Sequence, residues 1–220
     1  MSSVPLPPPS PLAARIHGVY AITADEARTD HLLAKADAAL ETGIRVLQYR
    51  NKLATAAMKR EQLQALKPLC DQHQCLLIVN DDWHLALELG LDAVHLGQDD
   101  GDLREARSAL GPDALIGVSC YDSIERAREL APLADYLAFG ALFASGTKPQ
   151  ATSASLAVLS QARALGLGRP IVGIGGITAD NIAQVLDAGA DAAAVIGALF
   201  NQPDVAEAAR RLLAAAAGCH

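Results

Sequence analysis

The chain has 220 residues, of which 51% are hydrophobic, and this size allows one large α/β domain with a sizeable core. Acidic side chains outnumber basic ones by 25 to 18, and no basic cluster could follow a phosphate backbone, so we do not expect nucleic acid as a partner. No uninterrupted apolar stretch reaches the roughly 18 residues that a membrane helix needs. We therefore expect a soluble protein with no membrane partner.

The first fifteen residues differ in composition from the rest of the chain. Five of the first eleven are proline, and the segment lacks the basic start and the apolar run of a signal peptide. We expect residues 1–15 to be a disordered tail and residues 16–220 to form one catalytic domain. Cys70, Cys75, Cys120 and Cys219 follow no metal-binding spacing and are too few to staple such a chain, which indicates reduced thiols in a cytoplasmic protein.

From residue 18 onward, short aliphatic runs alternate with stretches of helical apolar spacing. The runs predict eight strands, at 18–23, 45–50, 75–80, 93–97, 115–120, 136–140, 170–175 and 192–197. The helical stretches follow them, near 30–42, 55–73, 82–89, 102–110, 122–130, 152–166, 178–188 and 203–217. Asp102 and Asp122, each followed three residues later by Glu, have the form of a capping box.

Eight consecutive strand–helix units favour a single (β/α)8 TIM barrel with parallel strands, because a doubly wound open sheet usually stops at five or six strands. In such barrels the active site is built from the loops at the carboxyl ends of the strands. The polar residues at those ends are therefore the candidates for function.

The second strand ends in Gln48, Tyr49, Arg50, Asn51 and Lys52. Alternation along a strand places Gln48 and Arg50 on one face and Tyr49 on the other. Arg50 offers a planar fork suited to phosphate oxygens and Lys52 a mobile point charge, although both could also be solvated charges at a strand end.

Carboxylates follow the third and fourth strands. Asn80, Asp81 and Asp82 end the third strand, and Asp99 and Asp100 follow the fourth. Magnesium in proteins favours one or two carboxylates together with waters and substrate phosphate oxygens, which Asp81 and Asp100 would supply. Each Asp taken alone could instead be a helix N-cap.

The fifth strand carries Ser119, and the loop after the sixth contains Ser145, Thr147 and Lys148. This small, hydroxyl-rich loop with a terminal cation could fold over an anion, although an ordinary flexible loop has the same composition. His95 lies within the fourth strand, where a packed, hydrogen-bonded histidine is a more common finding than a catalyst.

The seventh strand continues into Gly175 and Gly176, and the eighth into Ile196 and Gly197. TIM barrels commonly bind phosphate at this pair of loops, through backbone N–H groups and a short helix N-terminus. The glycine pair could also serve only a tight turn. It is not a Rossmann fingerprint, because G-x-G-x-x-G is absent.

Six segments, QYRNK, NDD, HLGQDD, GVS, SGTK and VGIGGI, occur in that order and together resemble the thiamine-phosphate synthase family from about residue 18 to about residue 200. The resemblance implies a transferase of thiamine biosynthesis that uses Mg2+ to couple hydroxymethylpyrimidine pyrophosphate with thiazole phosphate, releasing pyrophosphate. Carried over by position, the pyrimidine pyrophosphate site comprises Gln48, Arg50, Lys52, Asn80, Ser119 and Lys148. Mg2+ falls on Asp81 and Asp100, and the thiazole phosphate on Ser145, Thr147, Gly176, Ile196 and Gly197. The expected catalytic residues are Arg50, Lys52, Ser119 and Lys148.

Some positions depart from the family pattern. Ala141 replaces a usual Pro, Ser145 a Thr, and Gly197 a Ser, so that Gly197 retains only a backbone N–H. The resemblance also allows a thiazole tautomerase of the same superfamily or a non-catalytic phosphate-binding barrel. The complete set of cations and carboxylates argues against both. Cys120 with Tyr121 replaces a segment that often includes His in this superfamily, which argues further against the tautomerase. The sequence is compatible with a homo-oligomer and leaves the order of substrate binding open.

Overall fold

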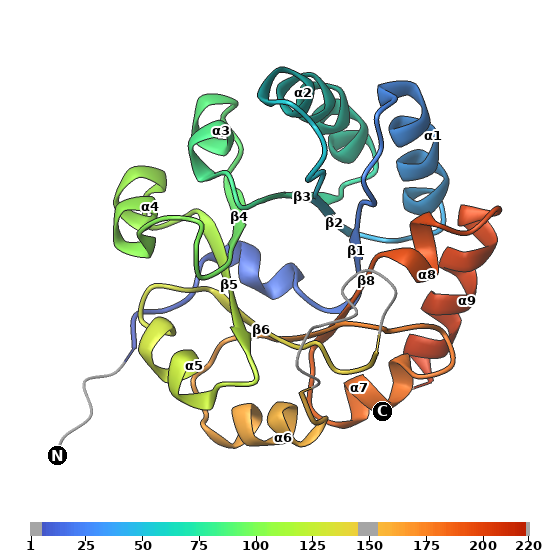
Figure 1. The fold of residues 1–220 in the computed structure, drawn as a ribbon. Helices are drawn as coiled ribbons and strands as arrows, with labels where there is room; N and C mark the ends of the chain where they lie inside the picture. The colour runs from blue at the N-terminus through green and yellow to red at the C-terminus, as the bar shows by residue number, and fades with distance from the viewer. Residues whose placement is uncertain (1–5, 145–153, 219–220) are drawn as a thin grey trace, which may run out of the picture.

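The computed structural model describes residues 6–144 and 154–218, and it shows a closed barrel of parallel strands in the order β1 to β8, ringed by helices (Figure 1). The strands are β1 (Gly18–Ile22), β2 (Val46–Tyr49), β3 (Leu76–Asn80), β4 (Ala93–Leu96), β5 (Leu115–Tyr121), β6 (Tyr136–Phe139), β7 (Ile171–Ile174) and β8 (Ala192–Val195). The helices are η1 (Pro11–Arg15), α1 (Thr29–Leu40), α2 (Ala56–Gln72), α3 (Trp83–Glu88), α4 (Leu103–Leu110), α5 (Ile124–Leu130), α6 (Ala157–Ala164), α7 (Ile182–Asp187), α8 (Gly197–Phe200) and α9 (Val205–Ala217). The predicted TIM barrel is confirmed, and each of the eight predicted strands is present.

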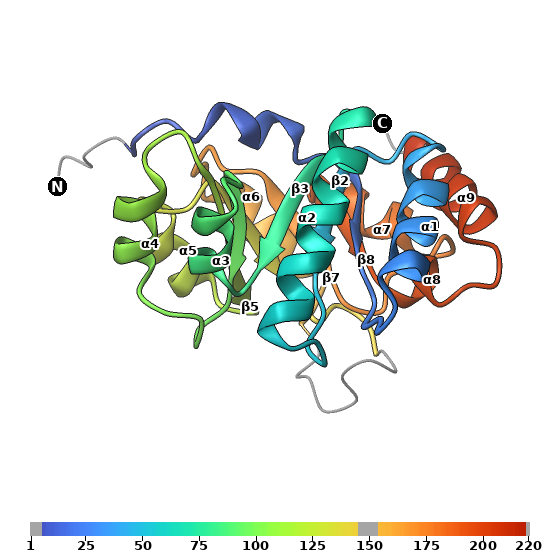
Figure 2. The same cartoon turned by 90° about the horizontal axis from the view of Figure 1, so that it is seen from above.

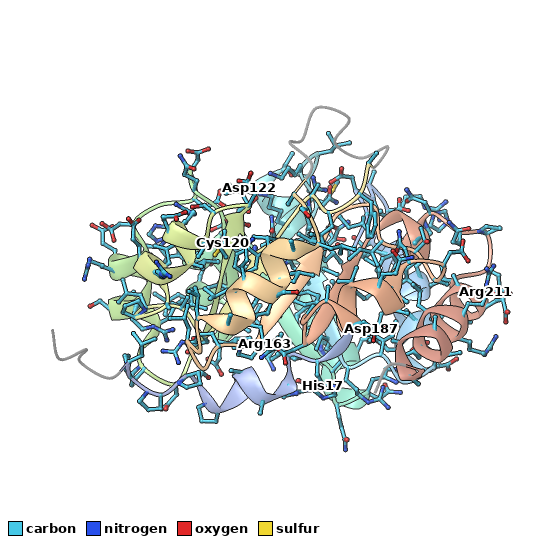
Figure 3. All side chains as sticks on the ribbon, turned by 90° about the horizontal axis from the view of Figure 1, so that it is seen from below. His17, Cys120, Asp122, Arg163, Asp187 and Arg211 are labelled. Atoms are coloured by element: carbon cyan, nitrogen blue, oxygen red, sulfur yellow. The ribbon has the colours of Figure 1, made fainter. Side chains whose placement is uncertain are left out.

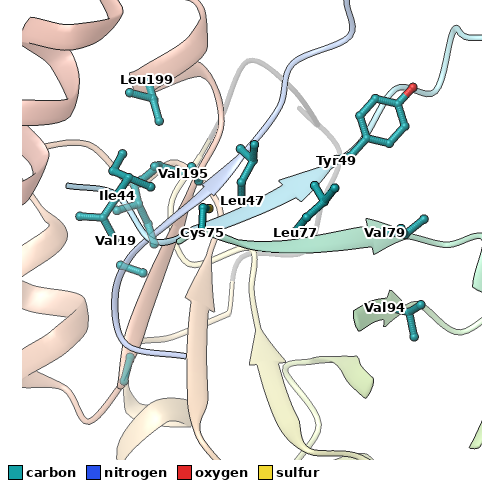
Figure 4. Packing of buried hydrophobic residues seen from close by; sticks show 14 of the residues in the cluster. Val19, Ile44, Leu47, Tyr49, Cys75, Leu77, Val79, Val94, Val195 and Leu199 are labelled. Atoms are coloured by element: carbon teal, nitrogen blue, oxygen red, sulfur yellow. The ribbon is translucent and has the colours of Figure 1, made fainter. Parts of the chain in front are cut away.

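The strands are buried on both faces, and alternation divides their side chains between two cores. Tyr20, Ile78 and Ala194 belong to the cluster that fills the barrel interior. The intervening Leu47 and Val195 belong to a second cluster, which lies between the strands and the surrounding helices (Figure 4). Any polar side chain on the inward face therefore lies inside the barrel or at its mouth.

The amino-terminal segment closes one end of the barrel. Helix η1 crosses the end at which the strands begin (Figure 2), and Ala13 and Ile16, each 2% exposed, pack on the interior cluster. Figure 3 shows His17, just after η1, and Asp122, just after β5, at opposite ends of the barrel. The candidate site therefore lies at the end that η1 does not cover.

The prediction of a disordered tail is wrong for residues 10–15, and residues 1–5 lie outside the described part. Ser10 is 3% exposed, and its backbone N–H donates to Asp135 Oδ1 at 2.7 Å. Its hydroxyl donates to the Asp113 carbonyl at 2.6 Å. Proline suits the first turn of a helix because it needs no N–H partner there, so the proline that suggested disorder at Pro11 instead starts η1.

Capping chemistry sets two of the helix starts near the site. Asp102 caps α4 as predicted, by accepting from the backbone N–H groups of Arg104 and Glu105. The predicted cap at Asp122 is wrong by one residue, because Ser123 accepts from the Arg126 backbone N–H and begins α5. Within the described ranges, no helix is long and apolar enough to cross a membrane.

Candidate active site

The predicted orientation at the end of β2 is confirmed for Gln48 and Tyr49. Gln48 points into the barrel, where its Nε2 donates to Tyr20 Oη at 2.8 Å. Tyr49 points outward and donates to Gln62 Oε1 of α2 at 2.7 Å. Because Arg50 lies two residues after Gln48, it continues the inward face at the barrel mouth.

The end of β2 is fixed to the end of β1 by Thr23 and Asp25. Thr23 Oγ1 accepts from the Arg50 backbone N–H and donates to the Arg50 carbonyl, both at 2.8 Å. Asp25 Oδ1 accepts from the Lys52 backbone N–H at 2.6 Å and lies 3.4 Å from Arg50 Nη1. The Arg50 side chain is only 13% exposed, so its guanidinium is held in one position and is not a freely solvated charge.

The carboxylates after β3 and β4 come together beside Lys52. Lys52 Nζ lies 3.5 Å from Asp81 Oδ2. Burial raises the pKa of the Asp100 carboxyl, the nearby Asp81 carboxylate raises it further, and the Gly97 N–H and Lys52 oppose the shift. The predicted pair of carboxylates is thus assembled in space, although 19 positions separate the two residues in the chain.

Local backbone geometry places these two carboxylates. Asp81 has a φ of +67°, a conformation that is uncommon outside glycine but tolerated by Asp, and its N–H donates to the His95 carbonyl at 2.8 Å. Asp100 Oδ2 accepts from the Gly97 N–H at 2.6 Å, and a Cβ on Gly97 would lie 2.8 Å from that oxygen. Asp82 is instead the N-cap of α3, accepting from the Leu85 N–H at 3.0 Å, which is the structural role considered for such residues.

A chain of polar side chains, four of them buried and the fifth, Ser119, half-buried, crosses the barrel interior below the mouth, from β2 to β5. We name it the polar chain, and its members are Gln48, Tyr20, Tyr136, His95 and Ser119. After the bond from Gln48 to Tyr20, its three remaining hydrogen bonds are Tyr20 Oη to Tyr136 Oη at 2.8 Å, Tyr136 Oη to His95 Nδ1 at 2.9 Å, and His95 Nε2 to Ser119 Oγ at 2.9 Å. Gln48 and Ser119, both predicted to bind the pyrimidine pyrophosphate, are thereby connected through the barrel interior.

His95 is the packed, hydrogen-bonded histidine that the sequence favours. It is 9% exposed, and its ring stacks at 5.6 Å between centroids on that of Tyr136. Burial lowers its pKa to about 4, with Asp100 opposing the shift, so the imidazole is neutral at pH 7. Ser119, at the end of this chain, is also fixed through its backbone, because its carbonyl accepts from Arg126 Nε at 2.8 Å.

The loops after β6 and β7 lie against each other at the opposite side of the mouth. Backbone N–H groups of Leu142 and Phe143 donate to the carbonyls of Ile174 and Gly175, each at 3.0 Å. Gly176 has a φ of +63°, and a Cβ there would lie 2.6 Å from the Ala144 carbonyl oxygen. Glycine at this position therefore serves close backbone approach as well as the turn.

The end of β8 presents Ile196 and Gly197 beside these loops. Ile196 packs on the interior cluster, and Gly197 begins the short helix α8. A short extra helix after the eighth strand is the element with which TIM barrels commonly bind phosphate. Ser145, Thr147 and Lys148, predicted to complete the site, lie outside the described residues.

The donor set fits magnesium, which the family resemblance implies. Asp81 and Asp100 would supply two hard oxygen ligands near one another, and the Asp81 carboxylate is one of the groups that raise the pKa of Asp100. Among the described residues no group of three or more His, Cys, Asp or Glu side chains could form an all-protein cage. Mg2+ prefers this kind of site, in which two carboxylates bind the ion and water and phosphate oxygens complete its coordination.

Sequence reasoning missed Thr23, Asp25, Tyr20 and Tyr136. Thr23 and Asp25 follow the first strand, and we predicted no functional residue there. Because active-site residues in TIM barrels come from strand ends, their position was the signal that could have identified them. Tyr20 and Tyr136 were recognisable only as hydroxyl-bearing aromatics within otherwise aliphatic strands. A buried Tyr hydroxyl usually finds a partner, which is the signal they offered.

Comparison with known proteins identifies the family. The family model for thiamine monophosphate synthase matches residues 19–199. The chain is 52% identical to the thiamine-phosphate synthase of Methylobacillus flagellatus over 197 residues, covering 89% of this chain and 93% of that one. It is likewise 52% identical to that of Chromobacterium violaceum over 199 residues, covering 90% and 95%. The solved thiamine phosphate pyrophosphorylase of Pyrococcus furiosus has 32% identity and a TM-score of 0.81, covering 91% of this chain and 96% of that one. Because the family model spans most of the chain and the relatives share about half of its residues, the chain belongs to the thiamine monophosphate synthase family.

Proposed function

We propose that the barrel mouth binds hydroxymethylpyrimidine pyrophosphate over β2 to β5 and thiazole phosphate over β7 and β8, and joins them into thiamine phosphate with release of pyrophosphate. Family membership makes the chain a transferase of thiamine biosynthesis; the proposal concerns its substrates, its metal and the residues that bind them. The observation that supports it best is the placement of Asp81 and Asp100 beside Lys52, next to the strand end that holds Arg50.

Arg50 and Lys52 are suited to the pyrophosphate. The Asp25 carboxylate binds the guanidinium of Arg50 and the backbone N–H of Lys52 at once, so it fixes the guanidinium relative to the backbone from which the Lys52 side chain extends. A planar guanidinium can hold two phosphate oxygens, whereas the 52% exposed ammonium of Lys52 can follow a charge that moves. Lys148, from the loop after β6, is proposed as a third cation on the same group.

Asp81 and Asp100 are proposed to hold Mg2+, with water and pyrophosphate oxygens as the remaining ligands. When bound, the ion would stabilise the negative charge that develops on the leaving pyrophosphate. Asn80, at the end of β3, has the position to contact the same substrate. Lys52 lies close enough to Asp81 to exchange between that carboxylate and a phosphate oxygen.

The thiazole phosphate is proposed to lie on the other half of the mouth, against the backbone of Gly176, Ile196 and Gly197, with Ser145 and Thr147 from the loop after β6. Gly197 offers a backbone N–H at the start of α8, where a side chain is not needed for phosphate binding. Holding this substrate by its phosphate places its ring nitrogen near the pyrimidine, which replaces a bimolecular encounter with a positioned one.

The reaction needs no protein nucleophile. The bond from the pyrimidine methylene carbon to the pyrophosphate oxygen breaks, and its electron pair leaves with that oxygen. The lone pair of the thiazole nitrogen then forms the new carbon–nitrogen bond. Arg50, Lys52 and Lys148 act by stabilising the departing negative charge, and Ser119 by holding the pyrimidine.

The test measures both products. Given both substrates and Mg2+, the purified chain should release pyrophosphate in step with thiamine phosphate, and chelation should stop both. Isomerisation of a thiazole carboxylate phosphate without pyrophosphate release would establish a tautomerase, and neither activity would establish a binding protein.

Neighbouring carboxylates provide a matched control for the metal assignment. Asp81→Asn should abolish most of the turnover, whereas Asp82→Asn should retain it, because Asn also caps a helix well. Equal loss in both variants would contradict the assignment of Mg2+ to Asp81.

A cytoplasmic location is part of the same proposal. Cys70, Cys75 and Cys120 are buried free thiols, and Cys219 lies outside the described residues. Free thiols suit a reducing compartment such as the cytoplasm.

A further inference from the structure

We propose that Tyr20, His95 and Tyr136 are positioning residues, which determine whether Gln48 and Ser119 present a hydrogen-bond donor or an acceptor to the substrate. The site would thereby select a pyrimidine that bears an amino group over one that bears a keto group. The inference rests on the proposed function, because it concerns the substrate that Gln48 and Ser119 bind. It extends that function by assigning a positioning role to three residues that the proposed function does not use.

The polar chain is too deeply buried to exchange its partners for water. Tyr20 is 1% exposed, Tyr136 0% and Gln48 3%. A buried hydroxyl or amide left without a partner costs about 1–3 kcal/mol, so each member depends on its neighbour to remain hydrogen-bonded. Breaking one link therefore affects the whole chain, including its two ends.

The barrel is built to accommodate this chain. The Tyr136 ring occupies the interior next to β5, where a Cβ on Gly117 would lie 1.9 Å from Tyr136 Cζ. Glycine at 117 is the residue that leaves room for the ring. The Tyr20 and Tyr136 rings meet edge to face at 6.1 Å between centroids, which brings their hydroxyls together at the centre.

The direction of hydrogen-bond donation along the polar chain follows from the number of protons that each member carries. Gln48 donates from Nε2 to Tyr20 Oη, so the single Tyr20 proton is directed to Tyr136 Oη. The Tyr136 proton in turn is directed to His95 Nδ1. A neutral imidazole has one donor and one acceptor, so His95 carries its proton on Nε2 and donates it to Ser119 Oγ.

This direction determines what the two ends offer to a ligand. Gln48 directs Nε2 toward Tyr20, which leaves Oε1 as the amide atom that the chain does not use. Although Nε2 keeps a second N–H, this oxygen is available as an acceptor at the β2 side of the mouth. Ser119 accepts from His95, so its own hydroxyl proton is available as a donor at the β5 side. An aminopyrimidine has the complementary pattern, with amino N–H donors and ring nitrogen acceptors. A keto pyrimidine instead places a carbonyl oxygen where the amino group would donate to Gln48 Oε1, so two acceptors face each other. This conflict is relieved only if the Gln48 amide turns over, which takes the Nε2 donor away from Tyr20 and reverses the direction of the chain.

The first experiment compares two substrates in three proteins. The ratio of kcat/KM for the amino pyrimidine pyrophosphate to that for its 4-oxo analogue should be large in the unaltered chain and should fall by about tenfold in Tyr136→Phe, the scale of one lost hydrogen bond in a buried site. The KM for thiazole phosphate should be unchanged. Tyr49→Phe is the matched control: it removes an equally buried hydroxyl, bonded to Gln62 outside the barrel, and should keep the ratio of the unaltered chain. An unchanged ratio in folded Tyr136→Phe would overturn the proposal.

The second experiment needs no variant and no turnover. Nitrogen-15 NMR of the histidine-labelled chain should show His95 as the neutral tautomer protonated on Nε2. A His95 protonated on Nδ1 in the unaltered chain would refute the assigned direction even if Tyr136→Phe failed to fold. If the chain showed no pyrophosphate release, the proposed function would fail, whereas the tautomer would still decide the direction of the chain.

Discussion

Acidification should destabilise this barrel through His95. Burial lowers the pKa of His95 to about 4 from an ordinary value of 6.5, and the neighbouring Asp100 only partly opposes the shift. Because the unfolded chain takes up the proton more readily than the folded one, the stabilising contribution is complete above pH 6.5 and is lost as the pH falls from 6.5 toward 4. Linkage gives a loss of about 2 kcal/mol at pH 5 from this one group, approaching about 3 kcal/mol below pH 4.

The assay is urea unfolding at about pH 7.5 and about pH 5, followed by the fluorescence of Trp83, the single tryptophan of the chain. Carboxylates also titrate in this range, so the informative quantity is the difference between variants. His95→Gln should lose about 2 kcal/mol less than the unaltered chain between the two pH values. His17→Gln, which replaces an exposed histidine, should behave like the unaltered chain. Equal pH dependence in His95→Gln and the unaltered chain would refute the reasoning that His95 is held neutral inside the barrel.

Three further predictions concern the site and its support. Asp100→Asn should lower kcat by about 100-fold with the fold intact, and excess Mg2+ should restore it only partly; near-normal pyrophosphate release would remove the metal assignment. Arg50→Lys should raise the KM for the pyrimidine pyrophosphate by about tenfold while calorimetry shows unchanged affinity for thiazole phosphate, because a lysine lacks the planar fork. An equal loss for both substrates would contradict the two-site layout. Gly117→Ala should cost about 1–3 kcal/mol of unfolding free energy in urea, because its Cβ collides with the Tyr136 ring; an unchanged stability would show that the ring does not fill that space.

The sequence was sufficient to predict the strands and helices, because their hydropathy patterns are local. Strands buried on both faces read as aliphatic runs, and their alternation with helices predicted the barrel. The opposite directions of Gln48 and Tyr49 follow from a period of two and were also predictable. The cap at Ser123 was not, because Asp122 and Ser123 are both good N-caps and only the register between β5 and α5 decides between them.

Features that depend on pairing between distant strands were not predictable. Asp25 acquires its role from the contact between the ends of β1 and β2, which brings its carboxylate to Arg50 and Lys52. The polar chain depends on which face of each strand points inward. In strands that are apolar on both sides, hydropathy does not reveal that choice. For this reason Tyr20 and Tyr136 could be seen as buried tyrosines but not as partners.

The charges at the barrel mouth support the proposal that Mg2+ and the cations bind the pyrophosphate together. In the part of the chain that the structure describes, the carboxylates of Asp25, Asp81 and Asp100 meet the cations of Arg50 and Lys52, which leaves one negative charge in excess. A pyrophosphate brought to such a surface is repelled. A divalent cation bound to Asp81 and Asp100, as proposed, would reverse the sign of the same surface and offset the repulsion between the two carboxylates. Binding of the metal and binding of the pyrophosphate are therefore expected to strengthen each other, since each supplies the charge that the other lacks.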